Sequence, residues 1–502
     1  MMKKPLAVIL AAVLITLVLT SCKAKTEPGA VTTTVSPVSE TTTVKPGIDI
    51  SSFKLSYSKS DSLNPFKSET LNNQVVQNLV FESLFTVDES YEAQLQLAES
   101  YEYTDSETLL VNLRQDIRFS NGNKMRSDNI VYSFNQAKDS PHWKNTLSAF
   151  SSASEEGKYS VKFKLNSPNP EAHKLLTFAV AKMAPDKKGY PIGSGRYKFN
   201  EGDGLVYLEK NTKYHDEFIP HFVKIILVNI TAEESIENAV NIGNISFTFR
   251  DLSSGSKNKM QCQKKPVNLN NLVYLGINSG SGITANESIR RAISLALDRE
   301  TLVKSAYRGY AKAALSVFNP ACALGKNTAI FTSNADADAA RQAIEQSGID
   351  KNDLKLDILT STTEGKADAA LLLKQQLEAV GFKVTINREK PSAYSSAVKY
   401  KNFSLYVGET RLTADMSLNS FFTGGGSTSA GIDLDGKSAK AYRGYLKGDN
   451  EIGRFVLDFS QELPFIPLLY RQGMICYSYS LHGDMQGYTD NYFSNIEDWY
   501  FN

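Results

Sequence analysis

The chain has 502 residues, 41% of them hydrophobic, and carries 55 Lys and Arg against 54 Asp and Glu. This length predicts about three domains, and a chain of this size can bury several cores without disulfides or metals. The formal net charge of +1, with no Arg/Lys-rich run, argues against a nucleic-acid binder, which needs a basic surface to pair with phosphates.

The first 21 residues are predicted to be an export signal. Lys3 and Lys4 precede an uncharged run, 5–21, that is dominated by Leu, Val, Ile and Ala. The run is marginal for crossing hydrocarbon, which takes about 20 residues, and fits a signal peptide better. It ends at 19–22 (LTSC), which resembles the lipobox of bacterial lipoproteins, so Cys22 is the predicted lipidation site. The alternative is an uncleaved anchor with an incidental cysteine.

Residues 22–47 are predicted to be a disordered tether, because their Thr/Pro-rich sequence has no apolar periodicity. No later stretch is apolar enough to span a membrane, so the remainder is expected outside the cytoplasm, held at the surface by acyl chains. With Cys22 acylated, Cys262, Cys322 and Cys476 allow at most one disulfide. They form no CxxC pair or zinc-site spacing, and buried apolar cysteines are the simpler interpretation.

The body of the chain alternates strand-like and helix-like segments. Alternating or short apolar runs predict strands at 53–57, 109–113, 161–165, 206–208, 223–228, 272–277, 354–359, 382–386 and 403–407, with a late apolar run at 465–470. Apolar residues at helical spacing predict helices at 75–84, 127–137, 287–307 and 367–380. The strand–helix–strand order over 354–386 is typical of a mostly parallel sheet. The fold class is therefore α/β, with mixed sheets and more than one lobe.

The sequence contains no HExxH or GxSxG motif. His215 and His221 are six residues apart, a spacing that suits neither one strand face nor one helix face, so we expect surface polar residues rather than a metal site. Residues 431–438 (GIDLDGKS) match the phosphate-binding pattern GxxxxGK[ST]. A loop rather than a strand precedes them, and Asp433 and Asp435 would repel phosphate. An exported enzyme or nucleotide-dependent protein remains an alternative, and we predict no cofactor and no metal.

Nine segments, in chain order, resemble motifs of the family 5 extracellular solute-binding proteins, which serve ABC importers of peptides and, in some branches, nickel. They are 63–65 (LNP), 80–84 (VFESL), 97–101 (LAESY), 113–122 (LRQDIRFSNG), 127–133 (SDNIVYS), 191–197 (PIGSGRY), 289–299 (IRRAISLALDR), 377–382 (LEAVGF) and 462–468 (ELPFIPL). The resemblance covers nearly everything after the tether.

The resemblance implies a type II periplasmic-binding-protein-like α/β fold. Mixed sheets would form two main lobes plus an extra inserted lobe, with a hinge closing over the ligand. Lobe I would combine 48–72, 186–266 and 462–502. Lobe II would be the insertion at 73–185, and lobe III would be 267–461.

The resemblance also implies a function without a reaction. The protein would be a lipid-anchored, monomeric substrate-binding protein on the outer face of the cytoplasmic membrane or in the periplasm. It would capture peptides between its lobes and deliver them to ABC permease subunits with cytoplasmic ATPases. The alternatives are a binder of nickel or a metal chelate, and a peptide sensor that takes no part in transport.

Site residues follow from the family's "GW-x-x-D" stretch, whose Asp holds the amine of the ligand. The matching residues, 408–412 (GETRL), have Glu409 in place of the Trp and Leu412 in place of the Asp. The amine anchor would then be Glu409 or, after a small shift, Asp415, while Arg411 would meet a carboxylate. The alternative is a surface ion pair between Glu409 and Arg411.

Further cleft residues are predicted by the same resemblance, with a simpler structural role as the alternative for several. Core packing is the alternative for Tyr274, turn chemistry for Asn278 and a tight glycine turn for Ser194. The full set of predicted ligand-binding residues is Glu69, Thr70, Leu71, Ser194, Tyr274, Asn278, Gly408, Glu409, Thr410, Arg411 and Asp415.

Overall fold

The computed structural model describes residues 52–252, 260–424 and 426–502. The predicted export signal, the lipidation site Cys22 and the tether at 22–47 lie outside the described residues. Among the described residues, no helix has both the length and the apolar character needed to cross a membrane.

One large mixed sheet contains eleven strands. They are β1 (Phe53–Tyr57), β8 (Tyr197–Gly202), β9 (Leu205–Lys210), β10 (Lys224–Asn229), β11 (Phe247–Arg250), β12 (Gln263–Ile277), β13 (Ala311–Ala313), β14 (Lys355–Ser361), β15 (Lys383–Glu389), β16 (Leu405–Arg411) and β17 (Phe465–Tyr477). Neighbours hydrogen-bond in the order β15-β14-β16-β12-β17-β11-β1-β10-β9-β8, and β13 pairs with β17. All ten runs identified in the sequence are strands, but the first half of β12 was missed because Gln263, Lys264 and Lys265 carry no apolar signal.

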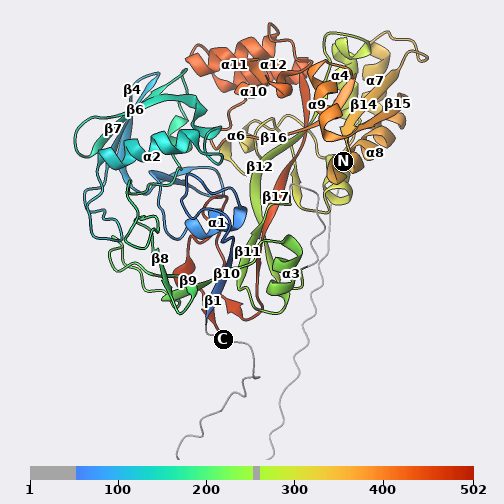
Figure 1. Cartoon of the computed structure of the whole chain (residues 1–502). Helices are drawn as coiled ribbons and strands as arrows, with labels where there is room; N and C mark the ends of the chain where they lie inside the picture. The colour runs from blue at the N-terminus through green and yellow to red at the C-terminus, as the bar shows by residue number, and fades with distance from the viewer. Residues whose placement is uncertain (1–51, 253–259, 425) are drawn as a thin grey trace, which may run out of the picture. The chain divides into compact units, whose positions relative to one another are not determined.

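Two long strands, β12 and β17, connect the two halves of this sheet (Figure 1). They pair antiparallel from Gln263 opposite Tyr477 to Gly276 opposite Phe465, and their register shifts between Asn268 and Leu272. Such an irregularity interrupts the ladder and allows a local bend. The predicted boundary between lobes I and III, at 266/267, lies inside β12 close to this point. The lobe boundaries themselves remain a prediction.

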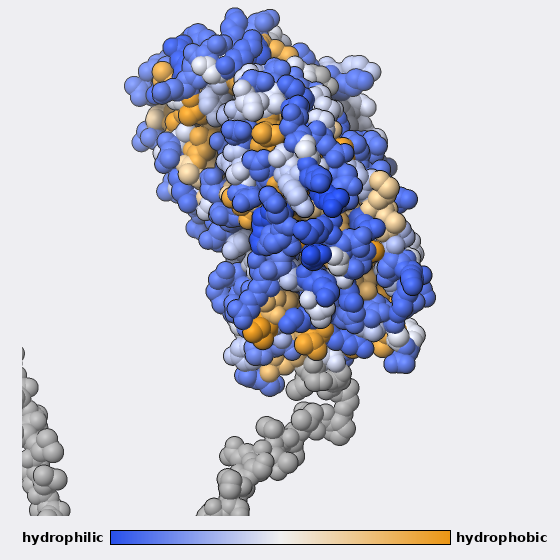
Figure 2. Space-filling model, turned by 90° about the vertical axis from the view of Figure 1, so that its left-hand side faces the viewer, coloured by the Kyte–Doolittle hydropathy of each residue, from blue (hydrophilic) through white to orange (hydrophobic). Residues whose placement is uncertain are grey.

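A smaller antiparallel sheet lies within predicted lobe II. Its strands, in the order β4-β5-β7-β6, are β4 (Ala98–Asp105), β5 (Thr108–Leu113), β7 (Ser160–Leu165) and β6 (Phe150–Glu155). Helix α2 (Ser127–Asp139) packs on it through Phe134, whose ring lies 6.0 Å from Phe150 and 5.4 Å from Phe163 between centroids. Figure 2 shows that the side carrying this sheet is mainly hydrophilic, with its apolar residues in small separate groups. The short strands β2 (Phe85–Val87) and β3 (Ala93–Leu95) form a separate pair.

The predicted strand–helix–strand unit is confirmed. β14 and β15 are parallel, and α8 (Glu364–Glu378) connects them. Leu373 and Leu377, four residues apart on α8, are fully buried in the same hydrophobic cluster as β14, as expected for one apolar helix face. Further helices among the described residues are α3 (Glu233–Asn241), α6 (Ala323–Asn327), α7 (Ala337–Gln346), α9 (Pro391–Lys399), α10 (Asn419–Phe422), α11 (Lys437–Lys447) and α12 (Ile452–Glu462).

Two helix predictions were too long. The segment 287–307 is α4 (Glu287–Leu295), then α5 (Arg299–Thr301), then a π-turn (Leu302–Ala306). Asp298 interrupts it as the N-cap of α5, because its carboxylate accepts the Thr301 amide hydrogen at 2.8 Å.

The predicted helix at 75–84 is α1 (Leu71–Gln77), which ends seven residues earlier. Beyond it, the Leu79 and Val80 carbonyls accept hydrogen bonds from Tyr197 and Gly195, both at 2.9 Å. Leu79 and Val80 are buried, so the apolar spacing correctly indicated burial. Their carbonyls, however, bond to amides distant in sequence and not to the next turn of a helix.

Candidate functional site

The predicted residues Gly408 and Tyr274 take part in tyrosine–glycine packing between β12 and β16. Tyr274 lies opposite Gly408, and Tyr406 lies opposite Gly276. Each tyrosine ring covers the facing glycine so closely that a Cβ there would overlap the ring. Tyr274 is 2% exposed, and its hydroxyl lies 3.2 Å from that of Tyr406. Tyr274 therefore contributes through core packing, the simpler of its two interpretations.

Asn278 lies just beyond the end of β12. Its amide donates to the carbonyls of Lys401 and Phe403, both at 3.4 Å, and its side-chain oxygen accepts from Gly280 at 3.4 Å. These contacts fit the turn chemistry considered for it. It lies at the opposite end of the β12–β16 ladder from Arg411, which pairs with Asn271.

The Glu409 carboxylate is held by buried partners. Its Oε1 accepts from Asn271 at 3.1 Å and lies 3.5 Å from Arg471, while Oε2 lies 3.9 Å from Lys366. Burial lowers the pKa of Lys366, and the nearby Glu409 charge opposes that shift. With its side chain 12% exposed, Glu409 is placed as a counter-ion for the buried Arg471 and the half-buried Lys366.

Arg411 is oriented by different partners. Its Nε donates to Asn271 Oδ1 at 2.7 Å, and a terminal nitrogen lies 2.5 Å from Asp251. In place of the alternative surface pair, Glu409 pairs with Lys366 and Arg471, and Arg411 pairs with Asp251. Thr410 lies between them, opposite Leu272. The Arg411 side chain is half-exposed and can still meet a ligand.

Asp415 lies at a junction between segments distant in sequence. Its carboxylate accepts from Thr413 Oγ1 at 2.5 Å, from the Ser417 amide at 3.2 Å and from Asn169 Nδ2 at 2.7 Å. Burial raises the pKa of Asp415, and these hydrogen bonds partly oppose the shift. Asn169 belongs to predicted lobe II and Asp415 to predicted lobe III, so the carboxylate links the two.

Two cavities meet beside this junction. One, of about 210 Å³, is lined by Asn169, Lys174 and Asp415. The other, of about 230 Å³, is lined by Lys174, Arg411 and His142. Tyr91, Lys174 and Ala414 are common to both. These cavities, which we call the junction cavities, are the candidate ligand site because acidic and basic side chains converge on them from both lobes.

A larger cavity of about 770 Å³ lies elsewhere, between the end of β1, residues 181–191 and the β8–β9 turn. It is lined by Asp61 and Asn64 but not by residues 408–415. We therefore assign the candidate site to the smaller junction cavities, despite their size.

Glu69, Thr70 and Leu71 lie at the start of α1, and Asp61 organises them. The Asp61 carboxylate accepts from the Glu69 amide at 3.2 Å, the Thr70 amide at 2.8 Å and Thr70 Oγ1 at 2.6 Å. Burial raises the pKa of Asp61, but these bonds more than offset it and the pKa is lowered. The Glu69 side chain is exposed. Sequence reasoning missed Asp61, because Thr70 is the N-cap of α1 and Asp61 lies too far before the helix to give a local capping signal.

Ser194 lies in a tight turn against the backbone of Val80. A Cβ at either Gly193 or Gly195 would overlap that backbone, which explains both glycines. The Ser194 carbonyl accepts from Asn211 Nδ2 at 3.3 Å, and its buried hydroxyl has no hydrogen-bond partner among the described residues. The contacts agree with the structural alternative for this turn.

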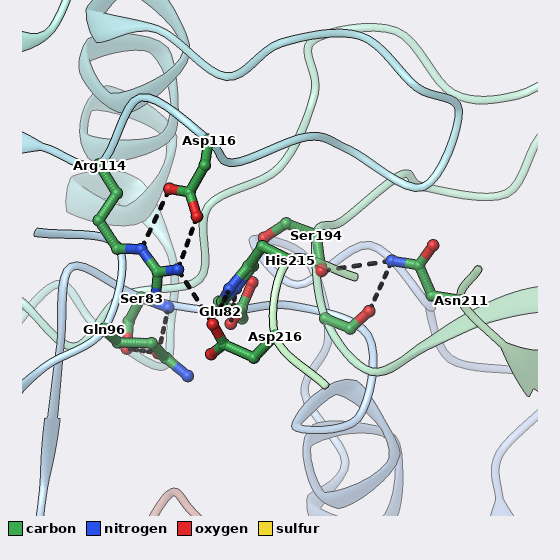
Figure 3. Close-up of polar contacts among 10 residues, drawn as sticks. Glu82, Ser83, Gln96, Arg114, Asp116, Ser194, Asn211, His215 and Asp216 are labelled. Carbon is green, nitrogen blue, oxygen red and sulfur yellow. Dashed lines mark hydrogen bonds and ion pairs between the residues drawn. The ribbon is translucent and has the colours of Figure 1, made fainter. Parts of the chain in front are cut away.

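Near this turn, the buried side chain of His215 joins a charged cluster that reaches the surface at Asp216 (Figure 3). Its Nε2 lies 2.9 Å from Glu82 Oε1 and its Nδ1 lies 3.1 Å from Asp216, which also contacts Arg114 at 3.0 Å. Burial lowers the pKa of His215, but the two carboxylates more than offset this and the pKa is raised. The prediction of a surface histidine was wrong: its side chain is 2% exposed. Its partner Glu82 is 133 residues away in sequence, too far for a local pattern to indicate.

The phosphate-loop match at 431–438 has a different role. α11 begins at Lys437, and the Ser438 amide donates to Glu462 Oε2 at 2.7 Å. A Cβ at Gly436 would overlap the same carboxylate. Glu462 therefore occupies the helix N-terminus where a phosphate would bind, and a loop rather than a strand precedes it.

Comparison with known proteins agrees with this architecture. The family model for "Bacterial extracellular solute-binding proteins, family 5 Middle" matches residues 92–431. The chain belongs to this family. The glutathione-binding protein GsiB of Escherichia coli K12 is 24% identical over 347 residues, which are 65% of this chain and 67% of GsiB.

Solved structures show the same fold. A putative peptide-binding protein AppA from Clostridium difficile aligns with a TM-score of 0.67 at 20% identity, covering 86% of this chain and 96% of its own. NikA from Brucella suis, in complex with Fe(III)-EDTA, aligns with a TM-score of 0.66 at 19% identity, covering 89% and 100%. The predicted type II periplasmic-binding-protein fold with mixed sheets is confirmed.

Proposed function

We propose that this family 5 protein is the substrate-binding component of an ABC importer, capturing peptides in the junction cavities and delivering them to a membrane permease. The observation that carries the proposal is the Asp415 carboxylate in the wall of one junction cavity, with Arg411 in the wall of the other and Lys174 in the walls of both. A peptide presents complementary groups: a protonated amine, a carboxylate and a backbone that needs hydrogen-bond partners.

Asp415 suits the amine better than Glu409 does. Glu409 already neutralises Lys366 and Arg471, whereas the neighbours of Asp415 are the neutral side chains of Thr413 and Asn169. Burial raises the pKa of Asp415, so an incoming ammonium would stabilise the ionised form. A cleft that excludes water strengthens this attraction.

The cationic groups would face the other end of the ligand. Lys174 contacts Glu92 at 3.0 Å and Glu171 at 2.9 Å, and it lines both cavities. Arg411, with a planar guanidinium, can grip a carboxylate in a bidentate manner. Binding and release need no bond-making step, so the proposed role is transport rather than catalysis. We further propose that the protein is a monomer. It would be anchored through lipidated Cys22 on the outer face of the cytoplasmic membrane or in the periplasm.

The peptide assignment is tested by native mass spectrometry of the full chain purified without denaturation, followed by acid release of the bound material. We expect a series of masses that resolve into short peptides. A single metal or chelate mass would instead favour the nickel-type branch. An empty protein that ignores a peptide library in a thermal-shift screen would contradict the peptide assignment.

The amine anchor is tested by Asp415→Asn. We expect the affinity for a captured peptide to fall roughly tenfold or more, since truncating one partner of a buried charged contact costs about 2 kcal/mol or more. The control ligand is the same peptide with an acetylated amine. Wild type and variant should bind this peptide equally weakly. Calorimetry on Glu409→Gln separates the two anchors: a larger loss there than in Asp415→Asn would move the amine to Glu409.

A metal chelate is the second candidate ligand, because His142 lines one junction cavity with its Nε2 3.8 Å from Asp490. The described residues contain no group of three or more His, Cys, Asp or Glu side chains placed to hold a metal ion. A chelate that brings its own ligands would need fewer from the protein. Uptake assays in cells with and without the permease would separate transport from sensing.

A further inference from the structure

Two of the cysteines lie side by side at one end of the long strand pair. Cys262 immediately precedes β12, and Cys476 is the penultimate residue of β17. In the antiparallel ladder Lys264 faces Cys476. Residues that face each other across a ladder share one side of the sheet, and so do residues two apart along a strand. Cys262 and Cys476 are therefore diagonal neighbours on the same side.

Their surroundings bring the two sulfur atoms together. Cys262 is 7% exposed and Cys476 is fully buried, and both belong to one hydrophobic cluster with Ile236, Val240 and Met474. The two thiols hydrogen-bond to each other. The Cα atoms of a diagonal pair lie about 7–8 Å apart, slightly beyond the roughly 7 Å that a disulfide bridges without backbone movement. Because Cys262 lies beyond the last paired residue of β12, only a small local shift is needed.

The remaining described cysteine has a different environment. Cys322 lies in another cluster, where its sulfur contacts the Asn319 carbonyl at 3.1 Å and accepts the Gly325 amide hydrogen at 3.3 Å. Burial raises the pKa of its thiol, which makes it a poor nucleophile. By contrast, the hydrogen bond from Cys476 lowers the pKa of the Cys262 thiol.

We propose that Cys262 and Cys476 are a disulfide-forming pair that joins the start of β12 to the end of β17. The Cys262 thiolate would attack a donor disulfide, either an extracytoplasmic thiol oxidase or oxidised glutathione, and release one donor thiol. Cys476 then attacks the Cys262 sulfur, forming the Sγ–Sγ bond and releasing the second donor thiol. Two protons leave the cysteines, and the donor disulfide accepts the two electrons.

The bond would act on the strands that connect the two halves of the main sheet. It lies on the β11 side of the register shift between Asn268 and Leu272. Fixing the strand pair there would confine bending to the irregular segment. It would also close a loop of more than two hundred residues, and long loops gain most from a crosslink in the chain-entropy model. The proposal is independent of which ligand the protein binds.

The test uses the full chain exported in its host, denatured in the presence of iodoacetamide so that buried free thiols react, digested without reduction and mapped by mass spectrometry. A second portion is first equilibrated with oxidised glutathione. We expect a linked peptide pair containing Cys262 and Cys476, lighter by two hydrogen atoms than the two peptides together, and an alkylated Cys322. The proposal is overturned if both cysteines remain alkylatable in both portions, or if Cys322 supplies the partner.

A stability measurement separates a crosslink from simple packing. Dithiothreitol should lower the unfolding midpoint of the oxidised wild type and of Cys322→Ser, which keeps the pair. It should leave the unfolding midpoints of Cys262→Ser and Cys476→Ser unchanged. If dithiothreitol removes the linked peptide from oxidised wild type without changing its unfolding midpoint, the stabilising role of the bond is overturned.

Discussion

His215 shows how a single side chain can join segments that the sequence keeps apart. It lies between β9 and β10, and its partner Glu82 follows α1. A buried pair of this kind contributes little net stability when intact, but it is costly to break because one charge is left without a partner. The cluster with Asp216 and Arg114 therefore makes stability at this point sensitive to protonation.

We predict that the free energy of unfolding falls as the pH rises above about 6.5, the unperturbed pKa of His215. The pKa is raised in the folded protein, so the stabilisation is fully present below the unfolded value. It is lost as the pH passes through the folded value. Denaturant unfolding of wild type and His215→Gln between pH 5.5 and 9 should show this dependence reduced in the variant.

The variant should also be less stable at pH 6, by about 1–3 kcal/mol, because Glu82 loses its cationic partner. His221→Gln, which replaces an exposed histidine, is the matched control and should keep the wild-type dependence. Equal pH profiles for wild type and His215→Gln would show that another group is responsible.

At the scale of elements, β12 and β16 are held together by reciprocal tyrosine–glycine packing. Tyr274 covers Gly408, and Tyr406 covers Gly276. Aromatic rings that cover a facing glycine stabilise strand pairs and pin their register. This fixes β16 at the point where it leads into Arg411 and Asp415.

We predict that Gly408→Ala destabilises the protein by about 1–3 kcal/mol, since its Cβ would displace a ring in a closely packed core. Thermal unfolding of Gly408→Ala, of Tyr274→Leu and of the double variant checks the cause. The double variant should lose less stability than the two single variants lose together. Gly453→Ala is the matched control. Its Cβ would meet nothing within 4 Å, and alanine is favoured inside α12. Additive losses in the double variant would contradict the packing explanation.

At the scale of the whole described unit, the hydrophobic core does not follow the predicted lobe boundaries. Buried residues of β1 and of β5 and β7 belong to one continuous cluster, although they lie in predicted lobes I and II. The β14–α8–β15 unit of predicted lobe III belongs to a different cluster. A shared core makes unfolding cooperative, whereas separate cores allow separate opening.

We predict that the amides of β1, β5 and β7 exchange through one common unfolding event. Native-state hydrogen exchange across a denaturant series should merge their opening free energies to within about 1 kcal/mol. The amides of β14 and β15 provide the internal comparison, and their opening free energies can merge at another denaturant concentration. An opening of β5 and β7 well below that of β1 would mean that the insertion is an independent folding unit.

Local pattern was sufficient for the ten runs predicted to be strands, and its failures among the predicted helices have identifiable causes. The runs 53–57 and 161–165 alternate, and they are strands β1 and β7. The failures at 75–84 and 287–307 arose because tertiary backbone bonds and the Asp298 cap ended helices that apolar spacing alone would extend.

The sequence by itself determined the fold class, the family and the improbability of a nucleotide site, because periodicity and ordered motifs are local properties of a chain. Only the tertiary structure placed Asp415 beside Asn169, turned Glu409 toward Lys366 and Arg471, and brought Cys262 against Cys476. Each of these contacts joins residues tens to hundreds of positions apart. Their proximity depends on strand register and burial, which no local spacing encodes.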